Sequence, residues 1–158
     1  MTAIIGTENG ELLVGTPQTD ELYGLAGDDT INGQESGDLI SGNQGNDIIN
    51  GDAGGDTMRG GKGNDNLSGG AGSDNIYGDI GSDTLTGGEG FDNFVLERQG
   101  ESLAIDNADV ITDFNIEEDG IGLMITKRDR LSGLVIRSRV FEKRERASAH
   151  HRQTGFAP

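Results

Sequence analysis

Large apolar side chains recur at every ninth residue from Leu13 to Phe94, and in nine of the ten repeats at least one of the two flanking residues is polar. The ten members are Leu13, Leu22, Ile31, Ile40, Ile49, Met58, Leu67, Ile76, Leu85 and Phe94. A polar–apolar–polar triplet is the pattern of a very short strand with one side chain directed inward. The six residues between triplets are rich in glycine, which permits positive φ angles and tight turns. The pattern therefore predicts three-residue strands that alternate with six-residue turns.

The same spacing defines ten complete nine-residue repeats over residues 6–95, as in "GGKGNDNLS" (60–68) and "GGAGSDNIY" (69–77). The first position is always Gly, the fourth is Gly in seven repeats, the sixth is always acidic and the eighth carries the apolar column. A short period that never slips predicts stacked structural units. We expect an all-β fold, a right-handed parallel β-roll (β-solenoid) of about five coils with two repeats per coil. The eighth-position column would be its only core.

The composition indicates that this thin core alone does not stabilise the fold. Only 32% of the residues are apolar, 4% are aromatic and the net charge is −16, values that are typical of disordered chains. No cysteine is present, so disulfides cannot stabilise the fold. A disordered, acidic, Gly-rich linker is the alternative interpretation, but it does not account for the apolar column. Bound cations are the remaining source of stability.

The sixth-position carboxylates would form a row along each edge of the roll, where they repel one another. Ca²⁺ would relieve this repulsion, because it binds about six to eight oxygen atoms at ~2.3–2.6 Å. The repeats hold 17 acidic and 2 basic residues, a net charge of −15, and eight ions between stacked turns would balance it. The predicted calcium ligands are Asp20, Asp29, Asp38, Asp47, Asp56, Asp65, Asp74, Asp83 and Asp92, with turn carbonyls near Gly27, Gly45, Gly54, Gly63, Gly72, Gly81 and Gly90. We expect the N-terminal sites to be the weakest, because Glu11 replaces Asp and Gln18 replaces Gly there.

These repeats resemble the nonapeptide of the repeats-in-toxin (RTX, haemolysin-type) family, Gly-Gly-x-Gly-x-Asp-x-(large apolar)-x. The resemblance implies a parallel β-roll with calcium in its turns and disorder without calcium. It also implies export by type I secretion machinery with no cleaved N-terminal signal. The start of the chain, "MTAIIGTENG", agrees with that, because it has neither a basic segment nor a long apolar one.

The segment "ADVITDFNIEEDGIGL" (108–123) is similar to the strand that follows the repeats in this family. The matching residues are Asp109, Ile111, Asp113, Phe114, Asp119 and Ile121. We expect the segment to form a short C-terminal β cap. The apolar residues expected to cover the open end of the core are Val110, Phe114, Ile116, Ile121 and Leu123.

The charge changes sign near Ile125. Residues 1–125 carry 25 acidic and 3 basic groups, a net of −22, whereas residues 126–158 carry 3 acidic and 9 basic groups, a net of +6. We predict a calcium-binding roll over residues 1–95, a capping segment over 96–125 and a basic, flexible tail over 126–158. The alternative for the tail is docking on the acidic roll or on an anionic surface. Secretion signals of the family are commonly acidic or polar, and this tail departs from that pattern.

Other binding motifs are not found. No Gly-x-x-x-x-Gly-Lys-Ser/Thr motif is present, nor is an EF-hand loop, and the adjacent His150 and His151 lack metal-ligand spacing. No catalytic constellation is visible, so we predict that the chain is not an enzyme. We also predict no nucleic-acid partner, and no apolar run approaches the ~18 residues needed to cross a membrane.

The predicted function is calcium binding that drives folding of a secreted, extracellular or cell-surface structural or interaction protein. The sequence does not identify its protein or surface ligand. One alternative is a non-catalytic module or fragment of a larger type I-secreted enzyme or toxin. Another is an ice- or surface-binding solenoid, which would show a regular threonine column on one flat face. Thr30, Thr57 and Thr84 share the seventh position at intervals of 27 residues, but the repeats between them carry other residues there.

Overall fold

The structure is a computed structural model that describes residues 1–97 and 108–124. One sheet contains β1 (Thr2–Ile5), β3 (Asp20–Ala26), β5 (Leu39–Gln44), β7 (Thr57–Lys62), β9 (Asn75–Ile80), β11 (Asn93–Glu97) and β13 (Gly120–Met124). The other contains β12 (Val110–Ile111), β10 (Thr84–Glu89), β8 (Asn66–Ala71), β6 (Ile48–Ala53), β4 (Thr30–Glu35) and β2 (Leu12–Val14), in that spatial order.

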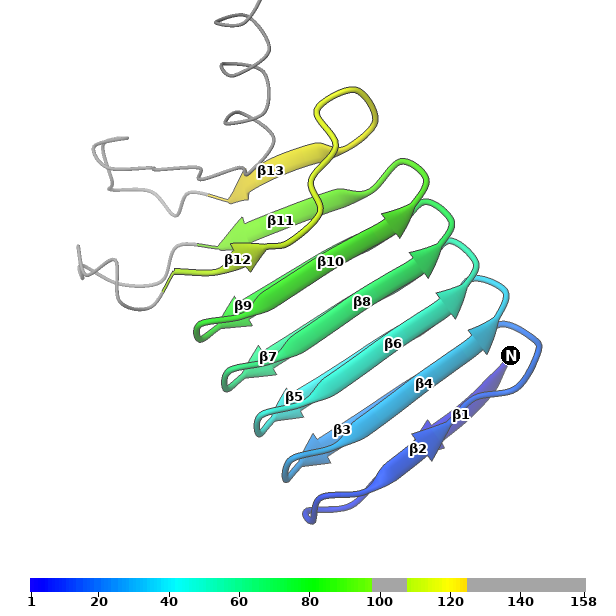
Figure 1. Ribbon diagram of the computed structural model, residues 1–158. Helices are drawn as coiled ribbons and strands as arrows, with labels where there is room; N and C mark the ends of the chain where they lie inside the picture. Colours follow the sequence, from blue (N-terminus) through cyan, green and yellow to red (C-terminus); the bar gives the residue numbers. More distant parts are fainter. Residues whose placement is uncertain (98–107, 125–158) are drawn as a thin grey trace, which may run out of the picture.

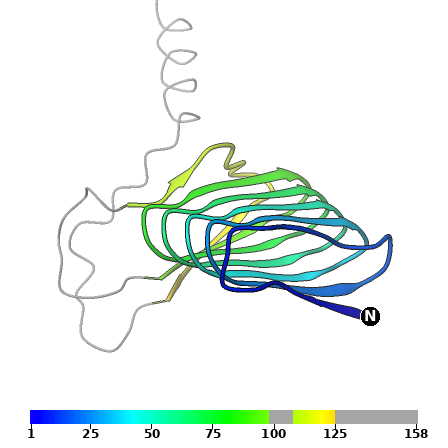
Figure 2. The same cartoon turned by 90° about the horizontal axis from the view of Figure 1, so that it is seen from below.

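The chain alternates between the two sheets, so that each strand pairs in parallel with the strand two repeats later. Leu22 of β3 lies beside Ile40 of β5, and Ile49 of β6 lies beside Leu67 of β8, a register of 18 residues. The strands stack along one axis in Figure 1, and the end-on view of Figure 2 shows nested, flattened coils. The predicted parallel β-roll of two repeats per coil is therefore confirmed.

From β3 to β11 the strands are longer and the turns between them shorter than the predicted three and six residues, whereas β2, with three residues, and the six-residue turn before it match the prediction. β8, for example, begins at the seventh position of one repeat, Asn66, and ends at the third position of the next, Ala71. The first-position glycine in between lies within the strand, and the register continues beyond it with the pair of Gly88 and Gly70. Only three residues, 72–74, then separate β8 from β9. The predicted division of the repeat was wrong in this respect.

All ten eighth-position side chains are buried and form one continuous core, as predicted. The first-position glycines in the same strands also face inward, because side chains alternate along a strand. A glycine leaves that inward space empty, and the Asp side chain of the same repeat lies against it. The interior thus has an apolar file along its middle and a file of carboxylates inside each edge.

The segment after the repeats continues the roll. β12 pairs with β10 and β13 with β11, which places Ile111 beside Leu85 and Ile121 beside Phe94. Ile111 and Phe114 pack against the core, and the Phe114 ring meets the Phe94 ring edge-on at 6.2 Å between centroids. The predicted β cap is therefore present in the described part of this segment.

Two of the residues expected to cover the core are in fact exposed. Val110 is 56% and Ile116 is 53% exposed. Val110 directly precedes the inward-facing Ile111 on a strand and therefore faces outward, while Ile116 lies in the turn before β13. The side chain of Leu123 lies outside the described part of the chain.

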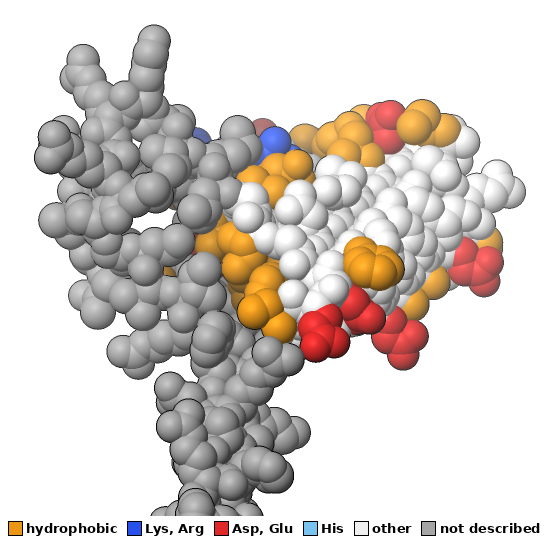
Figure 3. All heavy atoms as spheres, turned by 90° about the horizontal axis from the view of Figure 1, so that it is seen from above, with side chains coloured by type: hydrophobic (Ala, Val, Ile, Leu, Met, Phe, Trp, Pro, Cys, Tyr) orange, Lys and Arg blue, Asp and Glu red, His pale blue; other side chains and the backbone are white. Residues whose placement is uncertain are grey.

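The threonine row considered for an ice-binding face does not exist. Thr30 and Thr84 lie on β4 and β10 of one sheet, whereas Thr57 lies on β7 of the other. Successive repeats alternate between the two sheets, so residues three repeats apart lie on opposite sheets. Backbone and uncharged polar side chains cover most of the described surface shown in Figure 3, with several hydrophobic and a few acidic side chains among them.

The basic tail, with His150 and His151, lies outside the described residues. Within residues 1–97 and 108–124, no helix has the length and apolar character needed to cross a membrane.

Candidate metal sites

The sixth-position aspartates are buried and linked in two hydrogen-bonded ladders, one along each edge of the roll. Each Asp lies at the end of a turn, and its side chain folds back into the interior, with at most 4% of the residue exposed. The backbone N–H of Asp47 donates to Oδ1 of Asp65 at 2.8 Å, and the N–H of Asp56 donates to Oδ1 of Asp74 at 2.8 Å. One oxygen of each carboxylate is thus used to hold the preceding turn in place.

The second oxygen of these carboxylates has no partner. In eight aspartates, Oδ2 is buried and accepts no hydrogen bond from the protein: Asp29, Asp38, Asp47, Asp56, Asp65, Asp74, Asp83 and Asp92. A buried carboxylate oxygen without a partner is costly, because water no longer solvates its charge. These eight atoms are the largest unmet polar requirement in the described structure.

Each unpartnered oxygen lies against the first-position glycine of its own repeat. A Cβ built on Gly51 would collide with Oδ2 of Asp56 and would stand 2.6 Å from the carbonyl oxygen of Gly69. Gly24 shows the same arrangement with Oδ2 of Asp29, and with the carbonyl oxygen of Gly42 at 2.8 Å. A carboxylate oxygen and a carbonyl oxygen therefore converge where two turns stack, in space that only glycine leaves open.

The eight turns that contain these aspartates share one backbone conformation. In the third to tenth repeats, the second and fourth positions all have positive φ, as in Gly61 (113°) and Gly63 (141°). Glycine adopts this conformation without steric cost, whereas other residues adopt it rarely. The fourth-position carbonyl points along the edge, so that a Cβ on Gly63 would collide with the carbonyl oxygen of Gly45.

The fourth-position carbonyls are free for a metal ion. Those of Gly27, Gly45, Gly54, Gly63, Gly72, Gly81 and Gly90 accept no hydrogen bond from the part of the chain that the structure describes. The N–H groups of Gly45, Gly54, Gly63 and Gly72 are satisfied by backbone carbonyls; that of Gly63, for example, donates to the carbonyl of Ile80 at 2.9 Å. Carbonyl oxygens without competing donors are what a hard cation needs.

Burial raises the pKa of the middle carboxyls. It raises the pKa of Asp56 and Asp65 from 3.8 to about 6 and that of Asp83 to about 7; backbone N–H donors oppose the rise and neighbouring carboxylates add to it. Burial likewise raises the pKa of Asp29, Asp38, Asp47, Asp74 and Asp92. The protein alone therefore holds these groups poorly as anions, as expected where a cation is required.

The donor set fits calcium. It consists of carboxylate and carbonyl oxygens, the ligands that Ca²⁺ prefers. Among the described residues, no three His, Cys, Asp or Glu side chains surround a common point. An ion in these turns would therefore take one or two carboxylates and draw its other oxygens from the backbone. When bound, it would supply the positive charge that the unpartnered oxygens lack.

Asp20 and Glu11, at the sixth positions of the first two repeats, differ from the other eight. Oδ2 of Asp20 accepts hydrogen bonds from the N–H of Thr16 at 2.6 Å and from its hydroxyl at 2.7 Å. The Thr16 hydroxyl lowers the pKa of Asp20, in contrast to the raised pKa of the middle carboxyls. Both oxygens of Glu11 accept hydrogen bonds from Thr7. The predicted site residue Asp20 is thus already satisfied by the protein.

The ladders extend beyond the repeats to acidic residues that the prediction of site residues omitted. The N–H of Asp83 donates to Oδ1 of Asp109 at 3.0 Å, and that of Asp92 donates to Oδ1 of Asp119 at 3.2 Å. Asp113 accepts from the N–H groups of Gly87 and Gly88 at 2.9 Å. The available signal was that Asp109 and Asp119 each precede an inward-facing isoleucine by two residues, as every sixth-position Asp precedes its apolar residue.

A second ladder runs along only one edge of the roll. Oδ1 of Asp28 accepts from the N–H of Asn46 at 2.7 Å, and Oδ1 of Asn46 accepts from the N–H of Asn64 at 2.9 Å. Oδ1 of Asn64 in turn accepts from the N–H of Ser82 at 2.9 Å. These fifth-position bonds run opposite to those of the aspartates. The other edge has Gly37 and Gly55 at this position, which offer no side-chain acceptor.

Fold and site together define a calcium-binding parallel β-roll. Four overlapping matches to the RTX calcium-binding nonapeptide repeat cover residues 5–39, 23–58, 33–67 and 59–94, more than half of the chain. The chain therefore belongs to the RTX calcium-binding repeat family, and calcium is its ion. A comparison with curated proteins gave no match.

Proposed function

We propose that this chain is an exported structural and interaction protein that folds when calcium binds in its middle turns. Here "middle turns" means the turns of the third to tenth repeats. The observation that carries the proposal is the set of eight buried, unpartnered Oδ2 atoms, which are confined to these turns. The proposed ligands are those eight aspartates, from Asp29 to Asp92. We give Asp20 the lowest rank among the predicted ligands, because both of its oxygens already accept hydrogen bonds.

Each ion would lie between stacked turns, with backbone oxygens from the first- and fourth-position glycines. Without the ion, coil formation buries a row of repelling carboxylates and orders a Gly-rich chain, two costs that a core one residue wide does not offset. Because calcium binds the folded turns and not the unfolded chain, its binding free energy becomes folding free energy. Gly24 and Gly51 keep the space beside Oδ2 of Asp29 and Asp56 open for an ion, since a side chain on either glycine would fill it.

Export is part of the proposal. Modules that work outside cells bind calcium at ~10⁻⁴–10⁻³ M, so they fold only after they leave the cytoplasm. RTX proteins are usually exported, and type I secretion machinery is the proposed route. We further propose a roll over 1–95, a cap over 96–125 and a flexible tail over 126–158. The roll would serve equally as a non-catalytic module of a larger secreted enzyme or toxin, and an adjoining catalytic reading frame would favour that alternative.

Circular dichroism of the purified chain, with and without calcium, tests the proposal. We expect a β-sheet spectrum in millimolar calcium and its loss in excess chelator, with magnesium at the same concentration as the control. Asp56→Asn and Asp65→Asn should raise the calcium concentration at the midpoint. A β spectrum that persists in excess chelator at neutral pH and low ionic strength would contradict the proposal.

A further inference from the structure

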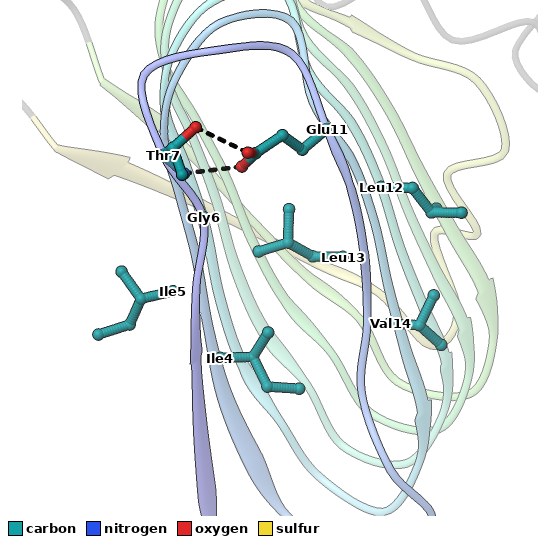
Figure 4. A pocket seen from close by; sticks show the side chains of 8 residues that line it. All are labelled: Ile4, Ile5, Gly6, Thr7, Glu11, Leu12, Leu13 and Val14. Atoms are coloured by element: carbon teal, nitrogen blue, oxygen red, sulfur yellow. Dashed lines mark hydrogen bonds between the residues drawn. The ribbon is translucent and has the colours of Figure 1, made fainter.

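The turns of the first two repeats are closed by the same set of hydrogen bonds. Thr7 donates to the two oxygens of Glu11 through its N–H and its hydroxyl, each at 2.7 Å (Figure 4). Thr16 donates to Asp20 through the same two groups. In both turns the residue two positions after the threonine donates its N–H to the threonine hydroxyl at 3.3 Å. The motif is a hydroxyl residue at the second position and a carboxylate four residues later.

The turn before β13 has the same design at the other end of the roll. The N–H of Asn115 donates to Oδ2 of Asp119 at 2.7 Å, again a separation of four residues. Its side-chain oxygen accepts from the N–H of Glu117 at 3.2 Å, in place of the threonine hydroxyl. We call residues 7–11, 16–20 and 115–119 the end turns.

Backbone conformation separates the end turns from the middle turns. All positive φ angles among the described residues occur in the third to tenth repeats, so none occurs in an end turn. The second-position residue Asn43 is instructive, because it is an Asn like Asn115. Its φ is 76°, its amide group donates to the carbonyl of Ser41 at 3.3 Å, and Oδ2 of Asp47 remains unpartnered. The direction of the N–H, and not residue type alone, therefore decides which carboxylates are satisfied.

A satisfied carboxylate is a poor calcium ligand. The N–H and O–H groups of Thr16 direct the positive ends of their dipoles at Oδ2 of Asp20, the atom that an ion would need. They occupy its lone pairs and repel a cation from the same space. An ion would have to break two short hydrogen bonds to Asp20, whereas at Asp65 it breaks none.

We propose that the three end turns are closed by their own hydrogen bonds, bind no calcium and flank the calcium-dependent middle turns. This inference rests on the proposed function and assigns its sites more narrowly. Thr7, Thr16 and Asn115 take the place of the ion at the two ends of the roll, and eight ions are expected in the turns between them.

The test is the number of calcium ions bound per full-length chain, measured by isothermal titration calorimetry and by equilibrium dialysis. The double variant Glu11→Gln, Asp20→Asn should bind as many ions as the original chain, with less than a twofold change in midpoint. The matched double variant Asp29→Asn, Asp38→Asn, in the adjacent middle turns, should lose about two ions per chain. Loss of one or two ions from the Glu11, Asp20 variant would overturn the inference.

A second variant, in which an end turn is replaced by the sequence of a middle turn, should gain a calcium site. Residues 16–19 (Thr-Pro-Gln-Thr) are replaced by the residues of 61–64 (Gly-Lys-Gly-Asn), that is Thr16→Gly, Pro17→Lys, Gln18→Gly and Thr19→Asn. The exchange frees Asp20 and should add one ion per chain. An unchanged ion count in a folded variant would count against the inference. A chain that binds no calcium in any form would instead refute the proposed function, so the two failures are distinguishable.

Discussion

Residues 61–65 and residues 16–20 occupy equivalent turns of the same roll, yet they satisfy their carboxylates differently. In the first, Gly61 and Gly63 have positive φ and Oδ2 of Asp65 has no partner in the protein. In the second, Thr16 supplies two donors to Asp20. A middle turn thus leaves one carboxylate oxygen unsatisfied, which supports the proposal that it depends on an external cation, whereas an end turn satisfies its carboxylate with its own donors.

This difference suits the position of each turn. An end turn has a neighbour on only one side along the roll, so fewer contacts with other turns hold it in place. The N-terminal end is also a shallow hollow lined by Ile4, Ile5, Leu12, Leu13 and Val14, with the Thr7–Glu11 turn at its rim (Figure 4). Internal hydrogen bonds keep the terminal coil closed there without an ion.

Acidification should have the largest effect, because it acts on all middle turns at once. Their carboxyls have raised pKa values, about 6 for Asp56 and Asp65 and about 7 for Asp83, against 3.8 in the unfolded chain. The calcium-free roll therefore takes up protons on folding and gains stability as the pH falls from about 7 towards 4. We expect the β signal in chelator to rise over this window, while calcium affinity falls because protons compete. No change in the chelator spectrum between pH 7.5 and 4.5 would contradict the raised pKa values.

Loss of one middle carboxylate should have the next largest effect. Asp65→Ala leaves the N–H of Asp47 without its acceptor and removes a proposed calcium ligand. We expect it to cost about 3–5 kcal/mol in saturating calcium, and Asp74→Ala to do the same. Glu11→Ala, in an exposed end turn, should cost about 1 kcal/mol or less. Urea unfolding and calcium titration measure both quantities, and equal losses from the three variants would remove the distinction between the turns.

Gly63→Ala tests the backbone of a middle turn. The residue has a φ of 141° and would place a Cβ against the carbonyl oxygen of Gly45. We expect a loss of about 2–4 kcal/mol in urea unfolding with calcium present. Asn9→Ala is the matched control, because Asn9 is the fourth-position residue of an end turn and has no positive φ. It should stay within about 0.5 kcal/mol, since only an exposed side-chain hydrogen bond is lost.

The fifth-position ladder should give the smallest effect and reveals a difference between the two edges. Asn64→Ala removes the acceptor of the Ser82 N–H and should cost about 1 kcal/mol. Ser73→Ala, at the same position on the other edge, should be nearly neutral. Hydrogen exchange at Ser82 reports the loss directly, and unchanged protection there would show that the ladder does not stabilise the turn.

The columns of the repeat predicted most of the fold. The ten apolar residues, the first-position glycines and the sixth-position acids each have one structural role, so the period was enough to place the core, the parallel pairing and the acidic edges. The strand boundaries were not predictable from the pattern, because glycines at the first position read as turn residues. In the structure they lie within strands, where their lack of a side chain makes room for Asp.

The sequence predicted which residues form the site, but not which of their atoms are available to an ion. Nothing in the Asp column indicated that Oδ1 serves the preceding turn while Oδ2 is left for an ion. The repeat pattern assigned no role to Thr7 and Thr16. Their role depends on a hydrogen bond across four residues, which becomes visible only once the turn conformation is known.

The most direct test of the account is the number of calcium ions bound at the folding midpoint and at saturation. Calorimetric titration should be followed in parallel with the β-sheet signal of the intact chain. The account predicts that folding and binding coincide and that binding saturates at about eight ions per chain, the number of unpartnered Oδ2 atoms. Saturation at ten or more ions with the end turns included, or a folded roll with no bound calcium at neutral pH, would contradict it.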